Sequence, residues 1–193
     1  MKRKEEAVSA IILAGGLSSR MGTCKAELSW DGISLIEHQV NKMHGLGIDD
    51  IIISGYPKPI AGTRFVADKY PLKGPLGGIH AGLLAAENSH CLVTSIDTPL
   101  VPVPLLSELV KTHIANSSNI SILSHGEMLE PLMGVYERWL SVIAEQILQT
   151  DNTSVRQLLS RVGFSKFRYE GDESLLCDCN TPEEFKTACA IKR

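Results

Sequence analysis

The sequence lacks several features that would place it in a broad class of protein. No run of apolar residues approaches the length of about 18 that a membrane-spanning helix needs. Lys and Arg number 19 against 22 Asp and Glu, and this small acidic excess excludes the broad basic surface of a typical nucleic-acid-binding protein. We therefore expect neither a membrane nor a nucleic acid as a partner.

Cysteines and histidines at metal-binding spacing are also missing. The five cysteines are an odd number and widely scattered, which argues against a disulfide framework. Cys177 and Cys179 are separated by one residue, whereas zinc-binding cysteines are usually separated by two or more. The six histidines show no ligand spacing either. Because the N-terminal residues also lack a secretory signal pattern, we expect a cytoplasmic protein with free thiols.

What is present is the composition of a folded domain. The chain has 193 residues, of which 44% are hydrophobic, and a net charge of −3. This length fits one ordinary domain with a sizeable core, and no repeat, low-complexity tract or linker divides it. We expect a single domain over residues 1–193, with residues 1–6 as a flexible N-terminal lead.

Strand and helix patterns alternate along this domain. Nearly all-apolar runs at residues 8–13, 50–54 and 90–96 are typical of strands buried on both faces of a sheet. Capping boxes at residues 34–37 and 181–184 predict the starts of two helices. The alternation predicts a three-layer, Rossmann-like α/β fold with a mostly parallel sheet. Further strands are expected at 64–67, 119–124, 132–136, 166–169 and 175–179, and further helices at 78–86, 104–115, 138–149 and 154–161.

Residues suited to phosphate chemistry follow the predicted strands, at the sheet edge where such folds bind ligands. Gly15 and Gly16 let a ligand approach backbone N–H groups after the first strand. Arg20 and Lys25, in the same loop, carry charges suited to phosphate oxygens. Asp97 follows another buried strand and offers the hard oxygen that Mg²⁺ prefers. The glycine spacing is neither that of a P-loop nor that of a dinucleotide-binding loop.

Each of these motifs also has an ordinary structural interpretation. A tight turn carrying two solvent-facing cations would account for residues 13–25, and a plain Pro-Gly turn would account for residues 74–78. Asp97 would then cap a turn, and Thr181 with Glu184 would cap a helix.

In combination, the motifs resemble those of the MobA-like nucleotidyltransferases. LAGGLSSRMGTCK at residues 13–25 is similar to the signature loop of that family, and the resemblance continues to about residue 190. Two positions depart from the family pattern: Cys24 stands where many members carry Asp, and Ser54 where some carry Asn. The other matching segments are VAD at 66–68, GPLGG at 74–78, DTP at 97–99, EPLMGVY at 130–136 and NTPEE at 180–184.

The resemblance implies a nucleotidyltransferase fold, with an antiparallel strand at residues 130–136 beside the acceptor site, and Mg²⁺ as cofactor. The implied catalytic residues are Arg20, Lys25 and Asp97; the implied nucleotide-binding residues are Leu13, Ala14, Gly15, Gly16, Lys25, Asp68, Gly78 and Asp97; the implied metal ligands are Asp97 and, as a weaker assignment, Asn180.

The implied reaction transfers GMP from GTP to the terminal phosphate of molybdopterin, the molybdenum cofactor, and releases pyrophosphate. A phosphate dianion is already a nucleophile, so this reaction needs no catalytic triad. The double glycine at residues 15–16 resembles guanylyl members, whereas cytidylyl relatives tend to have Ala-Ala-Gly there. The resemblance also implies transient contact with molybdenum cofactor carriers or client enzymes.

Three other functions remain open at this point. One is a CTP-dependent molybdopterin cytidylyltransferase, and another is a nucleotidyltransferase acting on a different small phosphate acceptor, such as a sugar phosphate. The third is a nucleotide- or cofactor-binding partner protein without catalysis.

Overall fold

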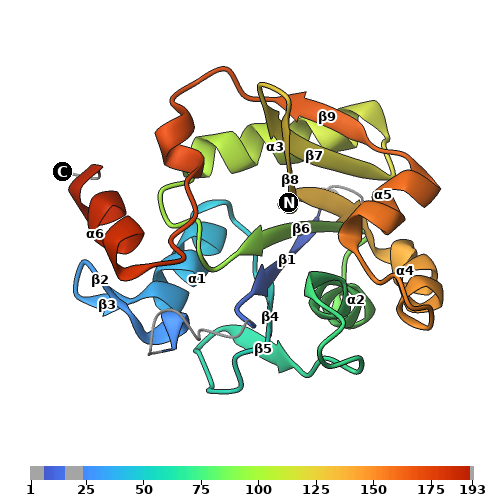
Figure 1. Ribbon diagram of the computed structural model, residues 1–193, viewed down its shortest axis with the longest axis horizontal. Helices are drawn as coiled ribbons and strands as arrows, with labels where there is room; N and C mark the ends of the chain where they lie inside the picture. The colour runs from blue at the N-terminus through green and yellow to red at the C-terminus, as the bar shows by residue number, and fades with distance from the viewer. Residues whose placement is uncertain (1–6, 16–23, 192–193) are drawn as a thin grey trace.

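The computed structural model describes residues 7–15 and 24–191, and its centre is a twisted seven-stranded sheet (Figure 1). The order of strands across the sheet is β5 (Thr63–Val66), β4 (Asp50–Ser54), β1 (Val8–Leu13), β6 (His90–Ser95), β8 (Met128–Glu137), β7 (Ile120–His125) and β9 (Ser165–Arg168). β8 runs antiparallel to both of its neighbours, and every other pairing in this sheet is parallel. The predicted mostly parallel sheet with an antiparallel strand is confirmed.

Helices cover both faces of the sheet and make the three layers visible in Figure 1. α1 (Leu35–Gly45) and α3 (Val103–Asn116) lie on one face, whereas α2 (Pro75–Ala85), α4 (Ser141–Leu148) and α5 (Val155–Val162) lie on the other. Successive residues of a strand point to opposite faces of the sheet. Ile12 packs in the hydrophobic core beneath α1 and α3, and Ile11 packs in the core beneath α2, α4 and α5. The all-apolar strand runs follow from this burial on both faces.

The last helix, α6 (Pro182–Ile191), packs against a small hairpin rather than on the main sheet (Figure 1). Phe185 of α6 meets Trp30 of the hairpin edge to face, with ring centroids 5.6 Å apart. The hairpin consists of β2 (Ser29–Trp30) and β3 (Ile33–Ser34), which were not expected from the sequence. Its turn residues, Asp31 and Gly32, both have positive φ, as a two-residue Asp-Gly turn requires.

The strand predicted at residues 175–179 is wrong. A 3₁₀ turn, η4 (Glu173–Leu176), takes its place because the Asp172 side chain accepts a hydrogen bond from Ser174 N (2.9 Å) and caps the turn. Cys179 N donates to Asp97 O (2.7 Å) instead of joining a ladder. Cys177 is exposed and Cys179 is buried, so the two thiols share no strand face.

Other differences concern element ends. α2 begins at Pro75 rather than residue 78, since proline is well tolerated in a first helical turn. The helix predicted at 138–149 starts as a separate 3₁₀ turn, η3 (Arg138–Leu140), before α4. The Ser34–Glu37 capping box of α1 is confirmed. All five cysteines are free, and the predicted lead at residues 1–6 lies outside the described residues.

Within the described part of the chain, every helix is too short or too polar to cross a lipid bilayer.

Candidate active site

Four parallel strands, β5, β4, β1 and β6, end at one edge of the sheet, and the segments that follow them build the candidate site. Ala14 N donates a hydrogen bond to Ser54 O (2.8 Å), and Ile96 N donates one to Leu13 O (3.0 Å). These two bonds continue the pairing of β1 with β4 and with β6 for one residue beyond the strands. The structure therefore places Leu13 and Ala14 at the strand ends, where ligands bind in such sheets.

Gly15 lies against Gly55 of the next loop, backbone to backbone. A Cβ atom on Gly55 would lie 2.3 Å from Gly15 Cα, and Gly55 has a φ of +89°. A Cβ atom on Gly15 would lie 3.2 Å from Gly55 Cα. Packing between the two loops thus accounts for Gly15. The predicted residues Gly16 and Arg20 lie outside the described residues.

Lys25, Asp97 and Asn180 come together from three distant segments. Lys25, at the start of η2 (Lys25–Glu27), donates from Nζ to Asn180 Oδ1 (2.7 Å). The same Nζ lies 3.4 Å from Asp97 Oδ2, and the two charged side chains are only 16% and 20% exposed. A lysine and two hard oxygen donors therefore converge in a partly desolvated position, where charge interactions are stronger than in water.

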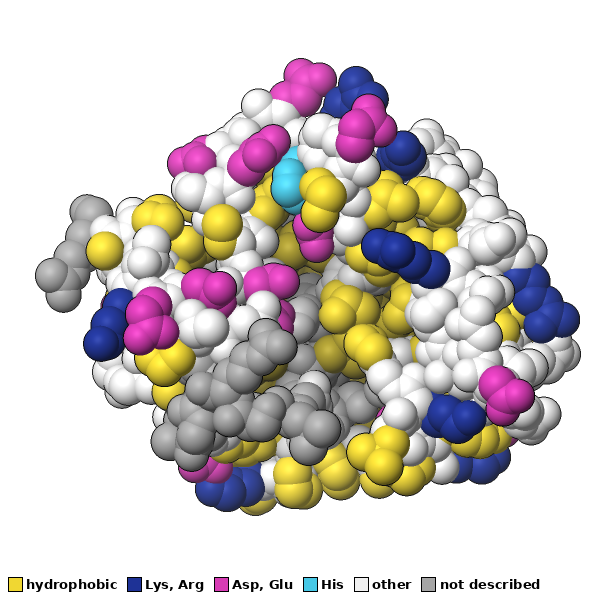
Figure 2. Space-filling model, viewed as in Figure 1, with side chains coloured by type: hydrophobic (Ala, Val, Ile, Leu, Met, Phe, Trp, Pro, Cys, Tyr) yellow, Lys and Arg dark blue, Asp and Glu magenta, His cyan; other side chains and the backbone are white. Residues whose placement is uncertain are grey.

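Asp178 is an exposed residue close enough to Asp97 for the two carboxylates to influence each other, and sequence reasoning gave it no role. Desolvation by the surrounding protein, followed by the negative charges of Asp97 and Glu130, raises the pKa of Asp178 to about 6. The sequence signal that could have identified Asp178 was its position two residues before Asn180 in the same motif. Figure 2 shows acidic side chains gathered beside a hollow on this face, with hydrophobic side chains on the other side of it.

These donors fit a magnesium ion. Mg²⁺ takes oxygen ligands, usually one or two carboxylates together with phosphate oxygens and water. Asp97, Asp178 and Asn180 offer two carboxylates and an amide oxygen. The effect of Asp97 on the pKa of Asp178 reflects an excess of negative charge that a divalent cation would offset.

The motif that contains Asn180 also caps α6. The helix-cap interpretation of residues 180–184 and the assignment of Asn180 to the site are therefore compatible. Glu184 Oε2 accepts hydrogen bonds from Asn180 N (2.7 Å) and Thr181 N (2.9 Å), and Thr181 Oγ1 accepts one from Glu184 N (3.2 Å). This reciprocal cap fixes the backbone from which the Asn180 side chain reaches Lys25.

Asp68 and Gly78 form a second group, around the N-terminus of α2. Asp68 Oδ1 accepts a hydrogen bond from Tyr70 N (2.7 Å), and its carboxylate lies where a Cβ atom on Gly77 would be. A Cβ atom on Gly78 would lie 3.0 Å from Ser54 Oγ and 3.1 Å from a Leu13 methyl. Gly77 therefore makes room for Asp68, and Gly78 lets α2 pack against the strand ends.

Three polar side chains of α1 hold the loop after β6. Gln39 Nε2 donates to Ser95 O (3.2 Å) and Thr98 O (3.3 Å). Lys42 Nζ donates to the same Thr98 carbonyl and to that of Pro99, each at 3.4 Å. His38 Nε2 lies 3.1 Å from Pro99 O. These contacts flank Asp97 in the chain and position its backbone.

Sequence reasoning missed this α1 contribution. Gln39 and Lys42 are 0% and 7% exposed, on the same side of the helix as its apolar stripe. Two polar residues within an otherwise apolar stripe were the available signal. Burial lowers the pKa of Lys42 to about 7.

A family model and several curated relatives match most of this chain. Residues 10–166 match the family model described as the MobA-like NTP transferase domain. The molybdenum cofactor guanylyltransferase of Pseudomonas fluorescens (strain SBW25) is 32% identical over 189 residues, which cover 95% of this chain and 94% of that protein. The molybdenum cofactor guanylyltransferase of Syntrophotalea carbinolica is 28% identical, over 92% of this chain and 89% of the relative.

A solved structure shares the fold. It is the molybdopterin-guanine dinucleotide biosynthesis protein A from Archaeoglobus fulgidus, with a TM-score of 0.79, 23% identity, and coverage of 95% of this chain and 98% of the other. The family match spans most of the strand–helix core that carries Leu13, Lys25 and Asp97. On the strength of that match and of a relative 32% identical over nearly its whole length, the chain belongs to the MobA-like NTP transferase family of nucleotidyltransferases.

Proposed function

We propose that this chain transfers GMP from GTP to the terminal phosphate of molybdopterin and releases pyrophosphate. The observation that carries the proposal is the convergence of Lys25, Asp97 and Asn180 at the carboxyl ends of the strands. The names of the two guanylyltransferase relatives supply the substrates.

Catalysis in this proposal consists of positioning and charge neutralisation. Lys25 and Arg20, together with backbone N–H groups of the loop after β1, stabilise the negative charge that develops on pyrophosphate as it leaves. Asp97, Asp178 and Asn180 would hold Mg²⁺, which supplies a positive charge for phosphate oxygens. The acceptor phosphate is itself the nucleophile, so no side chain has to remove a proton from it. Asp68 and the N-terminal turn of α2 border the nucleotide site.

Lys25 has to exchange partners during this reaction. Its ammonium group now forms an ion pair with Asp97 and donates a hydrogen bond to Asn180 Oδ1. With metal and triphosphate bound, the same group is free to bind phosphate oxygens. A lysine suits this exchange because its flexible stem carries three rotatable donors.

The preference for GTP over CTP rests on the relatives' names and on Gly16. Gly15 does not bear on the base, since its contact with Gly55 already requires a small residue. We further propose that a single domain carries the activity and that the protein works in a reducing, cytoplasmic compartment, which accords with its five free cysteines.

A pyrophosphate-release assay tests the proposed function. The purified chain with Mg²⁺ and molybdopterin is expected to consume GTP and not CTP, and to release no pyrophosphate when either substrate is left out. Equal or reversed use of CTP would indicate a cytidylyltransferase. Release that requires a sugar phosphate would move the chain to another acceptor class, and binding without release would make it a partner protein.

A further inference from the structure

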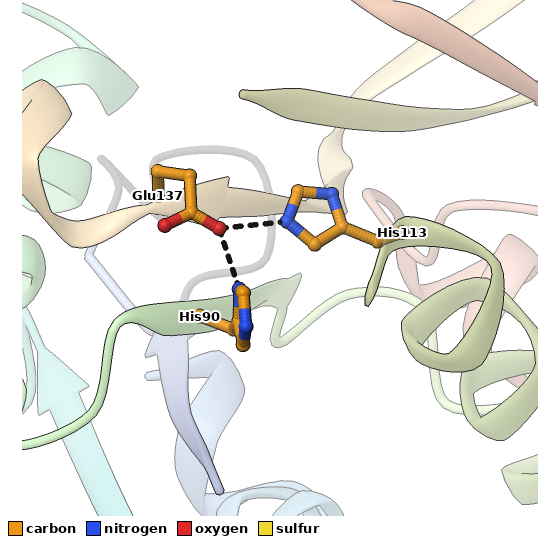
Figure 3. Close-up of side chains that lie close together, drawn as sticks. All are labelled: His90, His113 and Glu137. Atoms are coloured by element: carbon orange, nitrogen blue, oxygen red, sulfur yellow. Dashed lines mark hydrogen bonds and ion pairs between the residues drawn. The ribbon is translucent and has the colours of Figure 1, made fainter. Parts of the chain in front are cut away.

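Two histidines and a glutamate converge at the end of the sheet opposite the candidate active site (Figure 3). His90 begins β6, His113 lies in the last turn of α3, and Glu137 ends β8. Asp97 follows the other end of β6. Since a strand rises about 3.3 Å per residue, roughly 20 Å separates this cluster from Asp97.

Both imidazole rings aim a nitrogen at the same carboxylate oxygen. His90 Nδ1 lies 2.5 Å and His113 Nε2 lies 3.0 Å from Glu137 Oε1. The rings stand nearly perpendicular, with their centroids 5.4 Å apart. Three potential ligand atoms therefore converge on a single point, each from a different element.

The separations suit one metal ion. The three ligand atoms lie within 4.8 Å of one another, and no other group of His, Cys, Asp or Glu in residues 7–15 and 24–191 converges in this way. Zn²⁺ binds imidazole nitrogen and carboxylate oxygen at about 2.0–2.2 Å, which puts tetrahedral ligand atoms about 3.3–3.5 Å apart. Small side-chain rotations would bring the three atoms to that spacing.

A hydroxyl group orients the buried ring. Ser121 Oγ lies 2.9 Å from His113 Nδ1, on the side of the ring away from Glu137. A partner of this kind fixes the tautomer and orientation of a metal-binding histidine.

Solvent reaches the cluster from one side. His113 is 1% exposed, whereas the side chains of His90 and Glu137 are 19% and 16% exposed. Glu137 also lines a surface hollow next to Ser89 and Trp139. An ion therefore has an entry path, and water a place to complete four-coordination.

We propose that His90, His113 and Glu137 bind a zinc ion, with water as the fourth ligand, and that the ion ties α3 to the junction of β6 and β8. Two nitrogens and one carboxylate oxygen are ligands typical of Zn²⁺ rather than Mg²⁺. This ion is distinct from the magnesium proposed for the active site, since the two sites lie at opposite ends of β6.

Metal titration tests the site. The full chain, stripped with a chelator, is titrated with Zn²⁺ against a chromophoric indicator in excess Mg²⁺, which occupies oxygen-rich sites. One equivalent is expected to bind. His90→Ala and Glu137→Gln should each weaken binding at least about tenfold, and Ser121→Ala about 10- to 100-fold. Circular dichroism checks that each variant folds.

His125→Ala is the matched control, because His125 Nε2 also contacts a carboxylate, that of Glu130, at 2.9 Å. This variant should bind zinc as the unmodified chain does. Co²⁺ in the unmodified chain gives a second readout: the proposal expects tetrahedral d–d absorption without a thiolate charge-transfer band. Absence of a zinc equivalent, binding unchanged in His90→Ala, or a thiolate band would each overturn it.

Discussion

The two ends of β6 carry polar clusters of opposite character. Beyond the carboxyl end, Asp97 meets Lys25 and Asn180, which come from a 3₁₀ turn and a helix-capping segment. At the amino end, His90 meets His113 and Glu137, which belong to a long helix and a long strand.

The difference follows from what each cluster has to do. A substrate site exchanges its partners in every cycle, so its charged groups belong on loops held by a rigid scaffold. A structural metal keeps its ligands, and ligands on helices and strands are placed more precisely. The two proposals thus place a labile cluster at one end of β6 and a permanent one at the other.

The largest expected difference between the two clusters comes from removing the carboxylate of Asp97, which should lower turnover without changing zinc affinity. Asp97→Ala is expected to lower turnover by about 10²- to 10³-fold or more, as the loss of a preorganised electrostatic group does. Zinc affinity should stay unchanged. Steady-state pyrophosphate release and the zinc titration measure the two effects on one preparation.

The control for that variant is Asp151→Ala, which removes an exposed aspartate after α4. Its turnover should match that of the unmodified chain. If Asp97→Ala retained normal turnover and metal dependence, the metal ligand would lie elsewhere.

The loops of the carboxyl end depend on the contact between Gly15 and Gly55, and this contact can be broken. Gly55→Ala introduces a Cβ atom 2.3 Å from Gly15 Cα at a φ of +89°. We expect a loss of about 2–4 kcal/mol in the free energy of unfolding, from backbone strain and overpacking together. Urea denaturation at equilibrium measures it.

Gly126→Ala separates the two contributions. Gly126 also has positive φ, +51°, but a Cβ atom there would meet nothing within 4 Å. We expect this variant to lose about 1 kcal/mol, from strain alone. Equal losses in the two variants would show that the loops move apart without cost.

A pH-dependent effect concerns Lys42, whose side chain donates hydrogen bonds to the loop after β6. Burial lowers its pKa from 10.5 to about 7 in the folded chain. Between these values the unfolded chain binds the extra proton, so the contribution of Lys42 to stability rises with pH from about 7 towards 10.5, by at most about 1.4 kcal/mol per pH unit. Above about pH 9 the buried thiols of Cys91 and Cys179, whose pKa values are raised to about 12, act in the opposite direction. Lys42→Met should remove this slope, measured by urea denaturation at several pH values.

Lys111→Met, at an exposed lysine of α3, serves as the control and should keep the slope. Parallel pH profiles for Lys42→Met and the unmodified chain would mean that Lys42 is charged in the folded state throughout this range.

Sequence patterns predicted the helices and strands better than the contacts between residues that are distant in the chain. The apolar run at β1 and the capping box of α1 are local signals, and both elements formed as predicted. The predicted strand at residues 175–179 failed because a side-chain cap at Asp172 outweighed the local apolar pattern. Recognisable motifs point to Lys25 and Asp97, whereas the influence of Asp97 on Asp178 depends on how the fold brings the two segments together.

The sequence by itself determined the alternation of strands and helices, the glycine-rich loop and the family resemblance, because periodicity and motif spacing are properties of neighbouring residues. Only the tertiary structure brought Lys25 to Asn180, 155 residues away, and placed Gly15 against Gly55. It also joined two histidines without ligand spacing, His90 and His113, at a single carboxylate oxygen. The order of strands in the sheet decides such meetings, and residue spacing along the chain does not encode that order directly.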